Sequence, residues 1–172
     1  VALRLGAWLI DSGAHALILG EATCSPNFIS PKLYRNLVQP THKRLVRALR
    51  ASGWDHVGLH ICGNIVPIFE EIIDTGVNFL DVDYQVPAPV AMELAGDRVA
   101  LRGNLDPSAV FRFSPADRVA RATRELCEQV STHPRWILSS GCDIPPNTPE
   151  ENMRAFVEAR DAHAARTTSG VM

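Results

Sequence analysis

His60, Cys62 and Cys142 are the residues whose types and spacing best suit metal chemistry. His60 and Cys62 are two positions apart at the end of an apolar run, so in an extended chain their side chains point to the same face. Imidazole and thiolate groups bind zinc well, and three protein ligands leave a fourth tetrahedral position free, as in catalytic zinc sites. We therefore predict one zinc ion at these residues. The spacing alone fits equally a buried histidine with two inert cysteines.

Weaker candidates follow other apolar runs of the sequence. Asp83 could act as a base or bind a cationic group, or it could cap a loop. Glu21 is a candidate labile fourth ligand of the zinc ion. Gly103 and Asn104 read as a tight turn whose exposed backbone N–H groups could hold an anion, or as a plain turn.

The remaining cysteines and histidines have simpler interpretations. Cys127 falls on the apolar face of a helical stretch, where a small buried hydrophobe is expected. Cys24 reads as a loop thiol, although it could also line the pocket. Four histidines are predicted to lie at the surface: His15, His42, His56 and His163.

Five short apolar runs alternate with helical stretches along the chain. Most follow a glycine that can end a helix, and runs of this length between helices are typical of parallel strands buried on both faces. Ser30 and Ser114 each precede a proline and predict helix starts, while Pro40 predicts a kink in the first of these helices. The expected strands are residues 16–19, 57–61, 78–82, 99–102 and 136–139.

This alternation predicts a parallel sheet with right-handed crossovers. An open doubly wound sheet and a (β/α)8 barrel both fit. A complete barrel takes about 250 residues, so five strands in 172 residues are too few to close one. The candidate residues follow the strands, and the carboxyl ends of the strands form the active-site face in both architectures.

Composition limits the classes of partner. Apolar residues make up 46% of the chain and charged residues 21%, which is typical of a globular domain. A net charge of −2 argues against a broad basic surface for nucleic acid. The sequence has no apolar run long enough to span a bilayer and no signal-peptide pattern, and its four cysteines are too few for a disulfide scaffold. We therefore expect a cytoplasmic protein without nucleic-acid or membrane partners.

Four motifs, in this order, resemble the uroporphyrinogen decarboxylase superfamily. They are His-Ile-Cys-Gly-Asn at 60–64, Leu-Asp-Val-Asp at 80–83, Arg-Gly-Asn-Leu-Asp-Pro at 102–107, and Ser-Ser-Gly-Cys-Asp-Ile-Pro-Pro at 139–146. The resemblance covers nearly the whole chain and implies the C-terminal half, about five βα units, of a (β/α)8 TIM barrel. We therefore expect residues 1–172 to form a single domain of this type that lacks its N-terminal half.

The His-x-Cys pair with a later cysteine resembles one branch of that superfamily, the cobamide-dependent methyltransferases of the methylcobamide:coenzyme M type. The resemblance implies that His60, Cys62 and Cys142 bind zinc. It also implies methyl transfer between a methylated corrinoid protein and a thiol, such as coenzyme M, or another acceptor. The implied partners are the corrinoid protein, the small acceptor, and the missing half of the barrel or a second copy of the chain.

Two other functions remain open at this stage. The first is a decarboxylase acting on a porphyrinogen, which needs no metal and, in this superfamily, carries no His-x-Cys pair. The second is a non-catalytic fragment that docks a corrinoid protein and holds a structural zinc ion. A structural site would need a fourth protein ligand.

Overall fold

The computed structural model describes residues 2–169, which form one parallel sheet covered by helices. The strands lie in sequence order, and every neighbouring pair is parallel. This arrangement confirms the alternation of strands and helices predicted from the sequence. The strands are β1 (Ala16–Gly20), β2 (His56–His60), β3 (Phe79–Asp81), β4 (Ala100–Leu105) and β5 (Trp136–Ser140).

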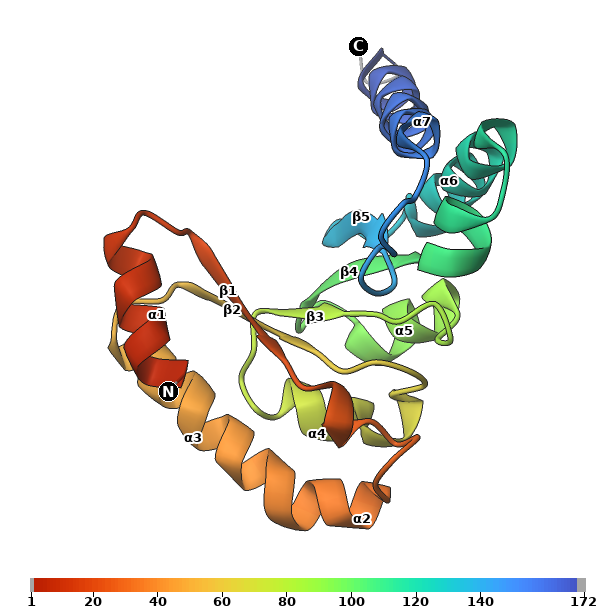
Figure 1. Ribbon diagram of the computed structural model, residues 1–172. Helices are drawn as coiled ribbons and strands as arrows, with labels where there is room; N and C mark the ends of the chain where they lie inside the picture. Colours follow the sequence, from red (N-terminus) through yellow and green to blue (C-terminus); the bar gives the residue numbers. More distant parts are fainter. Residues whose placement is uncertain (1, 170–172) are drawn as a thin grey trace.

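The helices follow one another around the outside of the curved sheet, from α1 near the N-terminus to α7 near the C-terminus (Figure 1). A doubly wound sheet reverses its strand order at a switch point. The order β1-β2-β3-β4-β5 contains no reversal, so the chain forms consecutive units of a barrel and the doubly wound alternative is wrong. The helices are α1 (Ala2–Asp11), α2 (Pro31–Leu33), α3 (Gln39–Ala51), α4 (Phe69–Ile73), α5 (Ala88–Ala95), α6 (Ala116–Val130) and α7 (Glu150–Ser169).

The core lies between the sheet and these helices. Strand residues such as Leu59 and Leu101 are fully buried, and Leu49 of α3 and Ile72 of α4 pack into the same cluster. A second cluster surrounds Phe111 and joins α6 to α7. The predicted apolar face of α6 is confirmed: Cys127 is buried there with Val119, Leu126 and Val130.

The predictions of helix starts and of a kink were correct in part. Ser30 caps α2, because its hydroxyl accepts a hydrogen bond from the Leu33 N–H. The predicted irregularity near Pro40 is a π-helical turn over Tyr34–Val38, which leads into α3. Proline lacks an N–H and clashes with the carbonyl one turn earlier, and a widened turn avoids both problems. The predicted cap at Ser114 is wrong, because its hydroxyl donates to the Ala109 carbonyl instead.

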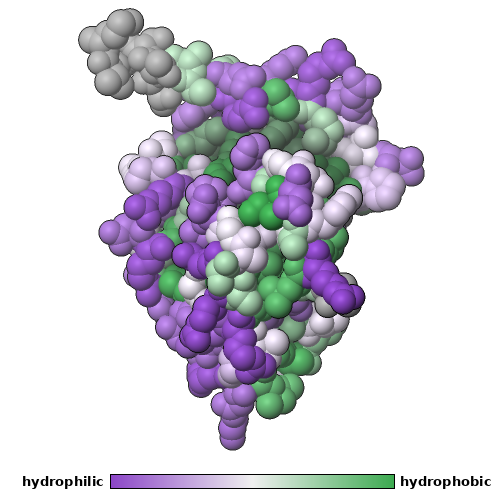
Figure 2. Space-filling view, turned by 90° about the vertical axis from the view of Figure 1, so that its left-hand side faces the viewer, coloured by the Kyte–Doolittle hydropathy of each residue, from purple (hydrophilic) through white to green (hydrophobic). Residues whose placement is uncertain are grey.

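Within residues 2–169, β1 and β5 each pair on one side only, so both edges of the sheet are open. Figure 2 views the molecule from the side on which α1 lies in Figure 1, and it shows hydrophobic surface between hydrophilic regions. Leu5 and Trp8 of α1 are 51% and 63% exposed, and Ile137 of β5 is 50% exposed. Within residues 2–169, no helix is long and apolar enough to cross a membrane.

Candidate metal centre

The structure brings His60, Cys62 and Cys142 together. His60 Nε2 lies 3.2 Å from the Cys62 Sγ and 3.6 Å from the Cys142 Sγ, and the two sulfur atoms are 3.6 Å apart. Two sulfur ligands of a tetrahedral zinc ion lie about 3.8 Å apart, because Zn–S bonds are about 2.3 Å long. The three donor atoms therefore have the chemistry and the mutual spacing that a zinc ion requires.

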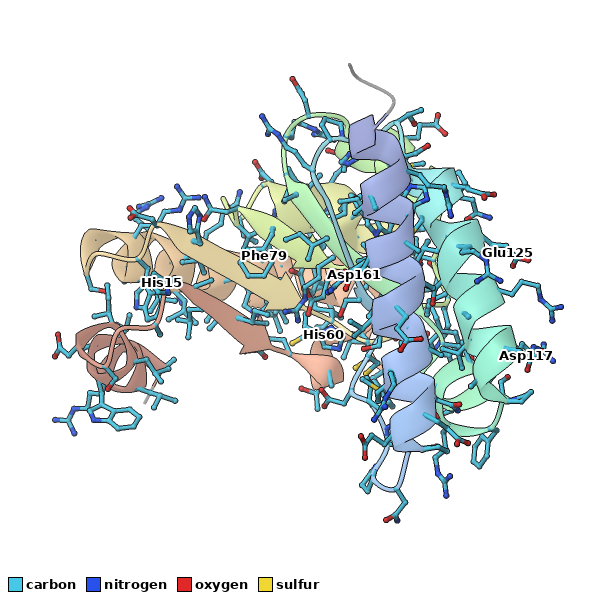
Figure 3. All side chains as sticks on the ribbon, turned by 90° about the horizontal axis from the view of Figure 1, so that it is seen from above. His15, His60, Phe79, Asp117, Glu125 and Asp161 are labelled. Atoms are coloured by element: carbon cyan, nitrogen blue, oxygen red, sulfur yellow. The ribbon has the colours of Figure 1, made fainter. Side chains whose placement is uncertain are left out.

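Strand geometry explains why these three side chains lie close together. His60 is the last residue of β2, and the buried Ile61 separates it from Cys62, so the two ligand candidates share a face. Cys142 follows the carboxyl end of β5, on the same edge of the parallel sheet. Figure 3 shows His60 near the middle of the molecule with sulfur atoms close by, whereas His15 lies far from it, beside α1.

Asp81 and Arg102 orient His60 from the neighbouring strands. The parallel register sets His60 beside Asp81 and Asp81 beside Arg102. Asp81 Oδ2 lies 3.4 Å from His60 Nδ1 and accepts a 2.6 Å hydrogen bond from Arg102 Nη2. A carboxylate on one ring nitrogen fixes the other nitrogen for a metal, which is the usual arrangement around metal-binding histidines. Asp81 is therefore a positioning residue that sequence reasoning missed.

The same contacts shift the acidity of the donors. The Asp81 carboxylate raises the pKa of His60, against the effect of burial. Burial, followed by the neighbouring Cys142 thiol, raises the pKa of Cys62 to about 11. Without a metal ion, Cys62 is thus a neutral thiol at physiological pH, and a bound cation would displace its proton.

A cavity of about 540 Å³ opens beside the three donors. It lies at the carboxyl ends of the strands, where barrels of this kind have their active sites. Each of the five strands contributes: Gly20 from β1, His60 from β2, Asp81 from β3, Arg102 from β4, and Ser139 and Ser140 from β5.

Gly141, next to Cys142, permits a close backbone approach. A Cβ atom on Gly141 would lie 2.4 Å from the backbone nitrogen of Tyr84. The Gly141 N–H also donates to the Leu105 carbonyl over 2.7 Å. Any larger residue would push Cys142 away from the loop that follows β3.

Asp83 and Asn104 hold that loop together. The Asp83 side chain is buried and accepts a hydrogen bond from the Gln85 N–H, so it acts as a loop cap in this structure. The Asn104 amide donates to the Val86 carbonyl. The predicted turn at Gly103 and Asn104 is wrong, because both residues lie inside β4. Catalysis by Asp83 and anion binding at Gly103 and Asn104 stay predictions.

Glu21 belongs to a different group of side chains. Its carboxylate lies 3.7 Å from the Cys24 Sγ, and both gather with His42 within 4.8 Å. A role for Glu21 as fourth ligand beside His60 stays a prediction. The interpretation of His42 as a surface residue is wrong, since this residue of α3 is only 3% exposed. The fully buried Tyr34 lies against His42, with its hydroxyl 3.1 Å from His42 Nδ1, and no signal in the sequence indicates this partner.

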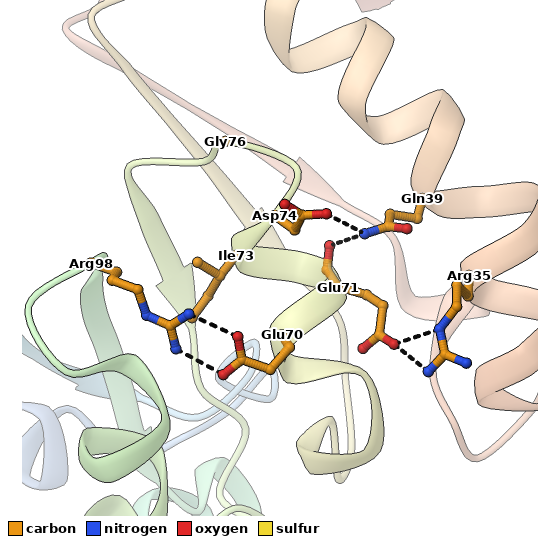
Figure 4. Close-up of a pocket in the computed structure, with 8 residues that line it drawn as sticks. All are labelled: Arg35, Gln39, Glu70, Glu71, Ile73, Asp74, Gly76 and Arg98. Carbon is orange, nitrogen blue, oxygen red and sulfur yellow. Dashed lines mark hydrogen bonds and ion pairs between the residues drawn. The ribbon is translucent and has the colours of Figure 1, made fainter.

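The larger hollow of the molecule lies elsewhere, on the outer surface beside α3 and α4 (Figure 4). Its volume is about 670 Å³. Arg35 pairs with Glu71, and Arg98 pairs with Glu70 through two hydrogen bonds. Gln39 donates to the Glu71 carbonyl and to Asp74. These groups satisfy one another and leave no converging set of donors among the residues that line this hollow.

The sequence matches the family model described as Uroporphyrinogen decarboxylase (URO-D) over residues 1–163. The chain belongs to the uroporphyrinogen decarboxylase family. It is 27% identical over 158 residues to the methylcobamide:CoM methyltransferase MtaA of Methanosarcina barkeri. It is 32% identical over 132 residues to a uroporphyrinogen decarboxylase of Thermus thermophilus.

A solved structure of a methyltransferase from Methanosarcina mazei superposes on this fold with a TM-score of 0.84 at 27% identity, over 94% of this chain and 46% of that one. The two sequence matches cover 91% and 76% of this chain. They cover only 44% and 37% of the relatives, so the chain spans less than half their length. The predicted partial barrel of this family type, corresponding to the C-terminal half, is therefore confirmed.

Proposed function

We propose that His60, Cys62 and Cys142 bind one zinc ion in an enzyme that transfers methyl groups between a methylated corrinoid protein and a thiol. The single observation that carries the proposal is the convergence of these three donor atoms within 3.6 Å of one another. The similarity to the M. barkeri relative, a methylcobamide:CoM methyltransferase, supports the choice of reaction.

Each residue has a defined part in this proposal. A zinc ion held by the three donors would lower the pKa of an acceptor thiol and keep it as a thiolate at neutral pH. Asp81 accepts the Nδ1 proton of His60 and so directs Nε2 toward the sulfurs. Arg102 holds Asp81 in place. Two cysteine thiolates would offset the charge of the ion, which would keep the acceptor sulfur nucleophilic.

The transfer itself balances without a further reagent. A bond forms between the acceptor sulfur and the methyl carbon while the cobalt–carbon bond of the partner corrinoid breaks. The electron pair of that bond stays on cobalt, and the proton of the thiol is released to solvent.

Methylcobalamin and coenzyme M are the reagents that test this reaction most simply. The chain, purified with zinc and supplemented with any barrel polypeptide encoded directly upstream, should convert methylcobalamin, and chelation should abolish the spectral change. Cys142→Ser should abolish it too, whereas Cys127→Ser should not. The similarity to the T. thermophilus uroporphyrinogen decarboxylase supports a porphyrinogen carboxy-lyase as an alternative. Decarboxylation of uroporphyrinogen that chelation does not affect would favour this alternative.

A docking fragment with structural zinc is the second alternative. A structural site is closed by four protein ligands, whereas within residues 2–169 this group has three members, His60, Cys62 and Cys142. An added thiol that never enters the zinc shell would favour this alternative.

We further propose that the active form needs the other strands of the barrel, whether they come from the same polypeptide or from another one. The exposed edges of β1 and β5 carry unpaired backbone groups, and such edges readily pair with other chains. The exposed Leu5, Trp8 and Ile137 add apolar surface. Light scattering of the 172-residue chain should show self-association, and a cooperatively unfolding monomer would contradict the proposal.

A further inference from the structure

Glu21, Cys24 and His42 form a second cluster that the methyltransferase proposal does not use. Glu21 and Cys24 lie in the segment after β1, and His42 comes from α3. One carboxylate oxygen, one sulfur and one ring nitrogen of these residues all lie within 4.8 Å of one another. Unlike surface acidic residues, they combine three ligand types, and two are half-buried while the third is buried.

Tyr34 orients the histidine of this cluster. The Tyr34 hydroxyl lies 3.1 Å from His42 Nδ1, and the two rings pack edge to face with centroids 5.8 Å apart. Tyr34 is fully buried, so it fixes the imidazole from within the core. A hydrogen-bonding partner on one ring nitrogen leaves the other available to a metal, as around metal-binding histidines generally.

The cluster shares no side chain with the first centre, although the two adjoin. The Glu21 N–H donates to the His60 carbonyl over 2.8 Å, so the segment carrying Glu21 continues directly from the strand beside β2. Glu21 and Cys24 are only three residues apart in a short helical turn. They can therefore approach a common ion with little movement of the backbone.

We propose that Glu21, Cys24 and His42 form a second binding site for a divalent metal ion of borderline softness, such as Zn²⁺ or Co²⁺. A carboxylate and a thiolate together neutralise the charge of the ion, and the imidazole supplies a neutral third ligand. A single thiolate gives this site a lower affinity than the pair at Cys62 and Cys142. The bound ion would clamp the segment after β1 onto α3.

Cobalt titration of the full chain separates the two sites, because thiolate ligation to Co²⁺ produces a characteristic charge-transfer absorption. The wild-type chain should bind two equivalents. The Cys62→Ala/Cys142→Ala variant should keep one equivalent with that absorption, and adding Cys24→Ser should remove it. Adding Cys127→Ser to the same double variant is the matched control and should change nothing. A double variant with a native circular dichroism spectrum and no thiolate absorption would overturn the proposal.

Alkylation of the unmodified chain gives a second test that needs no variant. Mass spectrometry after brief alkylation reports each cysteine separately. With Zn²⁺ in excess, Cys24 should react more slowly by about tenfold or more, because a coordinated thiolate is no longer a free nucleophile. Unchanged reactivity of Cys24 under conditions that protect Cys62 and Cys142 would show that only the first site binds zinc.

Discussion

Two hollows of the molecule, one on the outer surface and one at the strand ends, are similar in size but opposite in chemistry. The outer hollow beside α3 and α4 is lined by arginine and glutamate side chains that already pair with one another. The inner cavity at the strand ends is bordered by an imidazole and a thiol that converge with a second thiol on one point. The larger volume belongs to the outer hollow, about 670 Å³ against 540 Å³. Donor atoms of the right types that converge on one point locate the chemistry better than volume does.

Register explains why the inner cavity is built this way. Parallel pairing aligns His60, Asp81 and Arg102 across three strands, so a ligand candidate, its orienting carboxylate and a cation lie side by side. The outer pairs lie nearer the surface: Arg35 and Arg98 are 56% and 47% exposed, and their partners Glu71 and Glu70 are 15% and 59% exposed. Exposed pairs of this kind contribute little to stability, because water competes for both partners.

The sharpest difference between the two hollows should appear when Cys142 is changed. Cys142→Ser should weaken zinc binding by more than about 100-fold, which exceeds the range found for residues that only orient ligands. Metal analysis after dialysis against a weak chelator measures this loss. Cys127→Ser, in the core beneath α6, is the control and should retain zinc. Equal zinc content in both variants would remove Cys142 from the site.

Asp81→Asn should have the next largest effect. The amide oxygen can still accept the Nδ1 proton of His60, but the negative charge is lost, so zinc affinity should fall by about tenfold. Competition with a chromogenic chelator measures this change. Asp74→Asn removes a carboxylate that bonds Lys43 and Gln39 in the outer hollow, and it should leave zinc affinity unchanged. A similar loss of zinc affinity in both variants would mean that the effect comes from the net charge of the protein and not from the contact between Asp81 and His60.

Zinc binding should strengthen as the pH rises from about 6 to about 8. The pKa of Cys62 is raised to about 11, so its thiol holds a proton that the metal must displace. The pKa of His60 is raised as well, and protonation at lower pH blocks its ring nitrogen. Both shifts act in the same direction, and affinity is lost as the pH falls. Proton release measured in a weakly buffered titration should accompany binding, and binding without proton release would contradict this account.

The smallest effect is expected for the outer pairs. Arg35→Ala removes the ion-pair partner of Glu71 in the outer hollow, where the arginine side chain is 56% exposed to water. The free energy of unfolding should drop by less than about 1 kcal/mol, as for other exposed ion pairs. Urea denaturation measures this value, and zinc content should not change. A loss of zinc in this variant would show that the outer hollow affects metal binding, which would contradict the distinction between the two hollows.

Much of this fold was predictable, because glycine-ended helices and short apolar runs mark βα units directly. The five strands were placed to within a few residues, since buried parallel strands leave a strong signal. Strand order was not predictable, because alternation alone fits both open and barrel sheets. His60, Cys62 and Cys142 were selected by residue type and by their position after strands.

The surroundings of the site were harder to predict. Asp81 and Asp83 alternate along the same run, and only the register with β2 shows that Asp81 is the one beside His60. Gly103 and Asn104 look like a turn in sequence, yet they continue β4, where they pair with Leu138 and Ser139 of β5. His42 has the polarity of a surface residue, and its burial depends on Tyr34, whose hydroxyl contacts it inside the core.

X-ray absorption at the zinc edge, recorded on the zinc-loaded chain before and after addition of coenzyme M, tests the central claim most directly. The three-donor centre predicts two sulfur neighbours and one imidazole nitrogen in the free protein, with a third sulfur after the thiol is added. A zinc shell without sulfur would show that Cys62 and Cys142 are not its ligands. A sulfur-containing shell that stays the same with the thiol present would contradict the role of this centre in activating a methyl acceptor.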